Sequence, residues 1–238
     1  MEQAEQVSKV PLVLLPGMMC DARVFDAQIR ALSGQLPIMV APLLGGERIE
    51  DIAIHLLQQL PARFALAGLS MGGIVAMEIL RRAPERVSKL CLISTSPLPD
   101  TPAQAASREP LIIGARTGRM EDVLRQSMLP DYLAPGPQRI EILNQVHQMG
   151  MEMGEALFVA QTRALQRRRD QQGTLRKCKA PTLILCGEYD QLTPVKRHEF
   201  MAELIPNATL EVITAAGHLP TLERPDVVNR VLAEWLLG

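Results

Sequence analysis

Short, almost continuously apolar runs recur along the chain, and most are followed by a turn and then by helical spacing. The runs cover residues 10–15, 37–41, 63–67, 87–95, 181–186 and 208–214. Such short apolar runs are typical of strands buried on both faces of a parallel sheet. Helical spacing follows at residues 22–32, 50–60, 74–82, 194–204 and 226–237. The pattern predicts an α/β fold with a mostly parallel sheet of about six strands flanked by helices.

One long segment interrupts this alternation. Residues 98–178 contain no convincing strand, but helical spacing covers residues 120–129 and 137–169, with a break expected near Gly150 or Gly154. A structureless connection of that length is uncommon inside a compact domain. We therefore expect a core formed by residues 1–97 and 179–238 and a helical insert, residues 98–178, that covers one face as a lid.

Composition and charge limit the kinds of binding partner and the cellular compartment that we expect for this protein. The net charge is -1, which gives no electrostatic reason to expect a nucleic-acid partner. No apolar stretch approaches the ~20 residues needed for a membrane span, and the N-terminus lacks a signal-peptide pattern. The cysteines at positions 20, 91, 178 and 186 have no C-x-x-C spacing. A reduced, cytoplasmic protein is the expectation, with the oligomeric state left open.

A single serine, Ser70, lies where a predicted strand ends and a predicted helix begins. The segment Gly68-Leu69-Ser70-Met71-Gly72 fits the pattern G-x-S-x-G. A turn sharp enough to expose the hydroxyl brings backbone segments close together, so Gly68 and Gly72 have to be small. The N-terminus of the following helix favours negative charge at this point. The context predicts a nucleophilic serine, and the alternative is a tight turn with an incidental serine.

A serine nucleophile needs a base, and the base needs an orienting carboxylate. His218 follows the last predicted strand, and Asp190 follows the strand before it. Both therefore lie in turns at the carboxyl edge of the sheet, as Ser70 does. The other histidines are interpreted as surface or packing residues: His55, His147 and His198. The chain order of serine, aspartate and histidine matches one of the known triad arrangements.

Other roles for these acids remain open at this stage. Asp190 could instead cap the helix that begins near Pro194. Asp21 and Asp100 are alternative acids, although their positions along the chain favour them less.

The chain resembles the α/β-hydrolase fold family over nearly its whole length. The matching segments are "LVLLPGMMCD", "GLSMGG", "LILCGEYDQLTP" and "AGHLPTLERPDVV". The resemblance implies Ser70 as nucleophile, His218 as general base and Asp190 as its orienting acid. It also implies an oxyanion hole formed by the backbone N–H groups of Met18 and Met71, and a cap formed by the insert. No cofactor and no metal are expected.

Two departures from the family pattern change the expectation in detail. Pro16-Gly17 stands where the family commonly has His-Gly, so the main-chain donor is kept and the histidine side chain is lost. Only nine residues precede the first predicted strand, too few for the hairpin of larger members. This length predicts a sheet trimmed to six strands.

The function expected from these features is hydrolysis of a carboxylic ester or thioester of a small, largely apolar molecule. Alternatives are hydrolysis of a carbon–carbon bond or a lactone by the same residues, or a binding module that has lost catalysis. Several methionines surround the predicted site or lie in the insert, and we interpret those of the insert as core residues rather than pocket lining: Met120, Met128, Met149, Met151 and Met153.

Overall fold

Six parallel strands form one sheet in residues 10–237, which are the residues that the structure, a computed structural model, describes. The sheet has the order β2-β1-β3-β4-β5-β6. The predicted parallel sheet of six strands is therefore confirmed. The strands are β1 (Leu12–Leu15), β2 (Ile38–Val40), β3 (Phe64–Leu69), β4 (Val87–Ile93), β5 (Thr182–Gly187) and β6 (Ala208–Ile213).

The strand order reverses beside β1, because β2 pairs with one of its sides and β3 with the other. The connections that leave the carboxyl ends of β1 and β3 therefore run to opposite faces and leave a crevice between them. Parallel sheets bind their ligands at such a switch point. The chain places Gly17 after β1 and Ser70 after β3 at this crevice.

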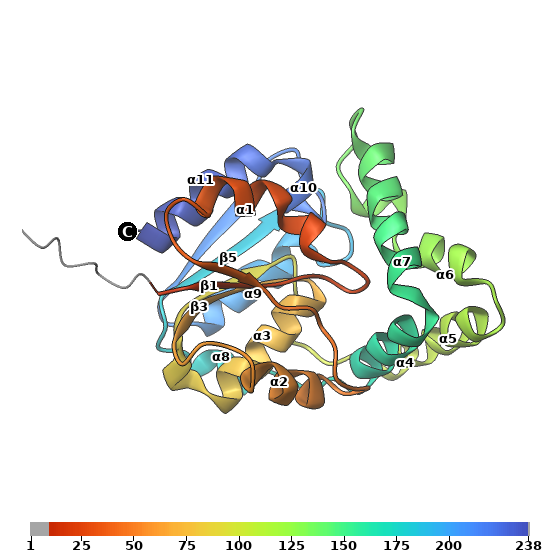
Figure 1. Ribbon diagram of the computed structural model, residues 1–238, viewed down its shortest axis with the longest axis horizontal. Helices are drawn as coiled ribbons and strands as arrows, with labels where there is room; N and C mark the ends of the chain where they lie inside the picture. Colours follow the sequence, from red (N-terminus) through yellow and green to blue (C-terminus); the bar gives the residue numbers. More distant parts are fainter. Residues whose placement is uncertain (1–9, 238) are drawn as a thin grey trace, which may run out of the picture.

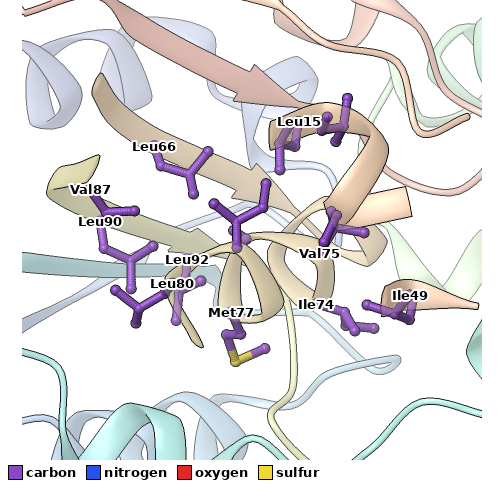
Figure 2. Packing of buried hydrophobic residues seen from close by; sticks show 14 of the residues in the cluster. Leu15, Ile49, Leu66, Ile74, Val75, Met77, Leu80, Val87, Leu90 and Leu92 are labelled. Atoms are coloured by element: carbon purple, nitrogen blue, oxygen red, sulfur yellow. The ribbon is translucent and has the colours of Figure 1, made fainter. Parts of the chain in front are cut away.

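Helices cover both faces of the sheet (Figure 1). Successive side chains of a strand point to opposite faces, so Leu12 and Leu14 pack with one apolar cluster while Val13 and Leu15 pack with the other. Figure 2 shows part of the cluster that contains Val13 and Leu15, to which Leu66 of the sheet and Val75 of the adjoining helix also belong. One face carries α1 (Asp26–Leu32), α10 (Pro220–Glu223) and α11 (Pro225–Leu237); the other carries α2 (Ile49–Leu57), α3 (Met71–Arg82), α8 (Gln172–Arg176) and α9 (Val195–Leu204).

The segment between β4 and β5 is helical, and most of it lies beyond the end of the sheet (Figure 1). Its helices share an apolar cluster that includes Ile112, Val123 and Phe158. Within the last long helix Gly154 has φ 81° and ψ 172°, a conformation open to glycine, and the predicted break is found there. The elements that precede α8 in this segment are α4 (Pro102–Ser107), α5 (Glu109–Arg116), α6 (Met120–Ser127), η3 (Pro130–Tyr132) and α7 (Arg139–Gln166).

Hydrophobic spacing did not predict α4 and α5. Helix α4 has no buried residue, so it leaves no apolar periodicity in the sequence. Its start is set by a reciprocal capping box, in which Thr101 and Gln104 each accept a hydrogen bond from the other's backbone N–H. The signal for this helix was therefore the pair Thr101 and Gln104 rather than a hydrophobic pattern. Two short 3₁₀ helices, η1 (Ala22–Phe25) and η2 (Pro84–Arg86), complete the described elements.

Candidate active site

Ser70 occupies a strained turn between β3 and α3. Its backbone has φ 52° and ψ -114°, outside the regions that non-glycine residues favour. Such a conformation costs about 1–3 kcal/mol and persists only where its surroundings enforce it. Here the Ser70 N–H donates to the carbonyl of Ile93 at 2.8 Å, and the Thr95 hydroxyl donates to the carbonyl of Ser70 at 2.7 Å. Strand β4 and the loop after it therefore hold the serine in place.

The glycines around Ser70 are required by close backbone approach. A Cβ at Gly68 would lie 2.3 Å from the carbonyl oxygen of Gly72, and a Cβ at Gly72 would lie 2.1 Å from that of Leu15. A Cβ at Gly73 would lie 2.6 Å from Thr95 Cγ2. The crowding expected at Gly68 and Gly72 is thus present, and it extends to Gly73, for which no requirement was predicted.

The structure brings Ser70, His218 and Asp190 into one hydrogen-bonded series. Ser70 Oγ lies 2.9 Å from His218 Nε2, and His218 Nδ1 lies 2.9 Å from Asp190 Oδ2 and 3.1 Å from Oδ1. The histidine and the aspartate are buried, with 3% and 2% of their surfaces exposed. Three turns at the carboxyl edge of the sheet supply the three side chains, as the sequence predicted.

Asp190 is held as a carboxylate. Its Oδ1 accepts hydrogen bonds from the N–H groups of Leu192 and Thr193 at 3.0 and 2.8 Å, and its Oδ2 accepts one from the Thr193 hydroxyl at 2.7 Å. Burial acts to raise the pKa of Asp190, but His218 and the Thr193 donors outweigh burial and lower it below its usual value. A carboxylate facing Nδ1 requires the proton on that nitrogen, which leaves Nε2 of His218 to accept the serine proton.

The other interpretations of the acidic residues do not match the geometry. Helix α9 has Pro194 as its N-cap and no side-chain capping hydrogen bond, so Asp190 does not cap it. Asp21 pairs with Arg23 at 2.6 Å and caps η1. Asp100 pairs with two arginines of the helical insert instead of approaching His218.

The loop after β1 presents a free backbone donor beside the serine turn. Among residues 10–237, none accepts a hydrogen bond from the N–H of Met18 or of Met71. The next N–H along the loop, that of Met19, donates to Oε1 of Gln161 at 2.9 Å, and Gln161 Nε2 donates to the carbonyl of Leu43 at 3.1 Å. Gln161, on α7, is buried and braces this loop. A glutamine in a long helix carries no sequence signal for such a role.

A buried carboxylate, Glu223, fixes the loop that carries His218. It accepts hydrogen bonds at 2.8 and 2.9 Å from the N–H groups of the residues on either side of His218, and at 2.7 Å from the N–H of Ala134 in the insert. The His218 N–H donates to the carbonyl of Tyr132 at 2.7 Å. Burial raises the pKa of Glu223, and the three N–H donors oppose that rise. The insert and the histidine loop are therefore joined directly.

Ser70 and His218 open into a cavity of about 700 Å³ between the sheet edge and the insert. Met18, Met71 and Met128 are among its lining residues, so the interpretation of Met128 as core rather than pocket lining was wrong, whereas Met149 is fully buried in the core. Met151 is 44% exposed, so its interpretation as a core residue was wrong: it faces solvent on the outside of α7. The apolar wall of the cavity includes Ile74, Leu111, Leu124, Leu143, Val146, Phe158, Leu165, Leu192 and Leu219.

His198, for which the sequence predicts only a surface or packing role, is fully buried behind the serine turn. Its Nε2 accepts a hydrogen bond from the Thr95 N–H at 3.1 Å, and its Nδ1 lies 3.3 Å from the carbonyl of Pro194. Burial lowers the pKa of His198 from 6.5 to about 4. The neutral ring, with its proton on Nδ1, thus links α9 to the loop that supports Ser70.

This buried histidine predicts a pH-dependent stability. The unfolded chain takes up a proton at His198 below pH 6.5 and the folded chain only below about pH 4, so stability falls as the pH drops through that window. We expect the unfolding free energy of the wild type to lose about 3 kcal/mol through this group between pH 7 and pH 4. His198→Gln lacks that loss, so the advantage of the wild type over the variant should shrink by the same amount. Urea unfolding of both proteins at the two pH values measures it, and an unchanged difference would contradict the assignment.

Several proteins of similar sequence or structure are named as esterases. The chain is 27% identical over 238 residues to a pimeloyl-[acyl-carrier protein] methyl ester esterase of Legionella pneumophila, with 95% of each chain covered. It is 28% identical over 246 residues to the enzyme of the same name from Aromatoleum aromaticum, covering 92% of this chain and 95% of that one. Among solved structures, a thermophilic esterase from Thermogutta terrifontis has a TM-score of 0.86 and 26% identity, covering 96% of this chain and 90% of the other.

The described helices include none that has both the length and the apolar character needed to cross a membrane. The sequence profile of the Alpha/beta hydrolase family matches residues 12–231, which span the whole sheet and the insert. The strand order, the serine turn and this match agree, and the chain belongs to the alpha/beta hydrolase family.

Proposed function

We propose that this protein is a serine hydrolase that cleaves a carboxylic ester or thioester of a small, largely apolar molecule through an acyl-enzyme. The observation that carries the proposal is the series of hydrogen bonds from Ser70 through His218 to Asp190 at the wall of a mainly apolar cavity. The relatives named as methyl ester esterases support ester hydrolysis.

Acylation starts with Ser70 Oγ, whose proton moves to Nε2 of His218 as the oxygen attacks the substrate carbonyl. Asp190, ionised and bonded to Nδ1, stabilises the imidazolium that forms. The N–H groups of Met18 and Met71 are the proposed donors to the oxyanion of the tetrahedral intermediate. Each such donor contributes about 3 kcal/mol to lowering the barrier.

Collapse of the intermediate requires a proton on the leaving group. His218 gives that proton from Nε2 to the departing alcohol or thiol, and the acyl group stays on Ser70. The histidine then removes a proton from water, which attacks the acyl carbonyl; when this second intermediate collapses, His218 returns the proton to Ser70 Oγ and the acid is released. No step needs a cofactor, and the reactants are the small substrate and water.

Two other functions receive less support. Hydrolysis of a carbon–carbon bond or a lactone would use the same three side chains, but the named relatives act on a methyl ester. A binding module without catalysis would be expected to lack a triad member or an elbow glycine. Ser70, His218 and Asp190 are all in place, and so are Gly68 and Gly72.

Two further assignments belong to the proposal. The insert, residues 98–178, is assigned as a cap over a core of residues 1–97 and 179–238, of which 1–9 and 238 lie outside the described residues, because its helices supply much of the cavity wall. A cytoplasmic location is proposed from the cysteines, which are all unpaired and buried, as expected in a reducing compartment: Cys20, Cys91, Cys178 and Cys186.

The proposal is tested with p-nitrophenyl esters from acetate to decanoate and with a fluorophosphonate probe. We expect turnover with an optimum chain length set by the cavity, and a single covalent adduct that peptide mass spectrometry places on Ser70. A protein that neither turns over any ester nor reacts with the probe would instead be a binding module. Turnover with the adduct on another residue would contradict the assigned nucleophile.

A further inference from the structure

Three charged side chains meet in the cavity wall outside the catalytic residues. Asp100, between β4 and α4, has a side chain that is only 1% exposed. Its Oδ2 accepts a hydrogen bond from Nε of Arg108 at 2.6 Å, and its Oδ1 lies 2.9 Å from Nη2 of Arg168. All three residues line the same cavity as Ser70. Two guanidinium groups share one carboxylate, so the cluster carries a net positive charge.

The cluster keeps donors that the protein does not use. Arg168 donates from Nε to the carbonyl of Leu98 at 3.0 Å, yet within residues 10–237 neither its Nη1 nor that of Arg108 has an acceptor. The two arginine side chains are only 14% and 23% exposed. Burial is the main cause that lowers the pKa of Arg168; Asp100 opposes it, while Arg108 and Arg197 lower it further. A second negative charge at this place would therefore be stabilised.

We propose that Arg108 and Arg168 bind a negatively charged oxygen group of the substrate, a carboxylate or a phosphate, while its ester carbonyl lies at Ser70. Guanidinium groups match such oxygens in geometry and charge, and Asp100 holds the pair in place. This inference rests on the proposed ester hydrolysis and names the class of ester: one that carries an anion in addition to the bond that is cleaved.

The other arginine of the cavity wall provides a contrast. Arg125 is 65% exposed and pairs with Glu121 at 2.9 Å, so its charge is already compensated and solvated. Arg125→Gln is therefore a matched control, since it removes the same kind of side chain from the same cavity without touching the cluster at Asp100.

The arginine pair should reverse the order in which an anionic and a neutral ester are preferred as substrates. An anionic group loses hydration on entering a mainly apolar cavity, so without a cationic partner an anionic ester should be the poorer substrate. We expect the opposite: kcat/KM for mono-p-nitrophenyl adipate about tenfold above that for p-nitrophenyl hexanoate, which has the same chain length. Arg108→Gln should reduce this ratio about tenfold, Arg108→Lys should restore part of it, and Arg125→Gln should leave it unchanged.

Binding can be measured without turnover. In Ser70→Ala, calorimetry should show monomethyl adipate binding about tenfold more tightly than methyl hexanoate, with the difference lost in Ser70→Ala/Arg108→Gln. The affinities of Ser70→Ala for butyl phosphate and for butanol provide the same comparison for a phosphate. Together the two comparisons show whether a carboxylate or a phosphate is preferred. Thermal unfolding of each variant identifies one that has lost its fold, in which case Arg108→Lys carries the comparison.

The outcomes separate the two proposals. If the wild type cleaves neither ester, ester hydrolysis is wrong, and the calorimetric comparison still decides whether the cluster binds anions. A second outcome is that the neutral ester is cleaved at least as well as the anionic ester and that neither anion binds more tightly than its neutral counterpart. The arginine pair would then be only a structural link between the insert and the core. A preference that Arg108→Gln leaves intact overturns the proposal as well.

Discussion

Ser70→Ala is expected to lower kcat for p-nitrophenyl hexanoate by about 10⁵-fold, because alanine leaves His218 no hydroxyl to activate. The residual rate would come from the cavity and the Met18 and Met71 N–H groups, which still bind the ester and polarise its carbonyl. The Ser70 side chain makes one hydrogen bond, to His218, so the fold should survive its removal. Initial rates of p-nitrophenolate release, measured at saturating ester on the purified variant, test this expectation.

Ser94→Ala is the control for that measurement. Ser94 is fully buried, lines the same cavity and has an Oγ without a hydrogen-bond partner among the described residues. Among the described residues no hydrogen bond joins it to His218, whose Nε2 is bonded to Ser70. Its removal should leave kcat within about threefold of the wild type. If Ser94→Ala lost activity and Ser70→Ala kept it, the nucleophile would have to be reassigned.

Gly72→Ala is expected to cost on the order of 4 kcal/mol of unfolding free energy, a large part of what a typical domain has. The new methyl group would lie 2.1 Å from the carbonyl oxygen of Leu15 and 2.6 Å from that of Pro16. Both obstacles are backbone atoms at the end of β1, so no side-chain rotation can relieve the overlap. Because β1 is paired on both sides within the sheet, we expect a lower urea midpoint and little folded protein at 37 °C.

Gly173→Ala makes the same chemical change where there is room for it. Gly173 lies in α8, and a methyl group added there would have no atom within 4 Å apart from its chain neighbours and the backbone of its own helix. Alanine is favoured over glycine in a helix by about 1 kcal/mol, so this variant should be as stable as the wild type or more so. Equal urea midpoints for Gly72→Ala and Gly173→Ala would show that the serine turn has more freedom than its geometry indicates.

The serine turn and the meeting of Ser70, His218 and Asp190 could be predicted because local chemistry constrains them. A nucleophile between a strand and a helix requires small neighbours, and parallel strands deliver Asp190 and His218 to the same edge of the sheet. The strands themselves carried clear apolar runs, which is why the order of elements in the core and the family assignment are both confirmed.

The bracing of the site could not be read from the sequence, because it depends on contacts between distant segments. The bond from the Met19 N–H to Gln161 joins residues 142 positions apart. His198 looks like an ordinary helical residue until α9 packs against the loop at Thr95. The pairing of Arg168 with Asp100 likewise appears only when the end of α7 returns to the sheet edge. No local pattern encodes such pairs.

The hydrogen bonds around Glu223 have a consequence for building chimeric enzymes. A chimera that takes its insert from a relative would ordinarily be joined in the two segments that connect the insert to the core. Here the Tyr132 carbonyl accepts a hydrogen bond from the His218 N–H, and the Ala134 N–H donates to Glu223, whose carboxylate holds the backbone on either side of the histidine. A graft whose backbone does not follow the same path takes away the acceptor of the His218 N–H and one of the three N–H donors of Glu223. Residues 132–134 therefore belong, by their bonding, with the catalytic half of any such hybrid.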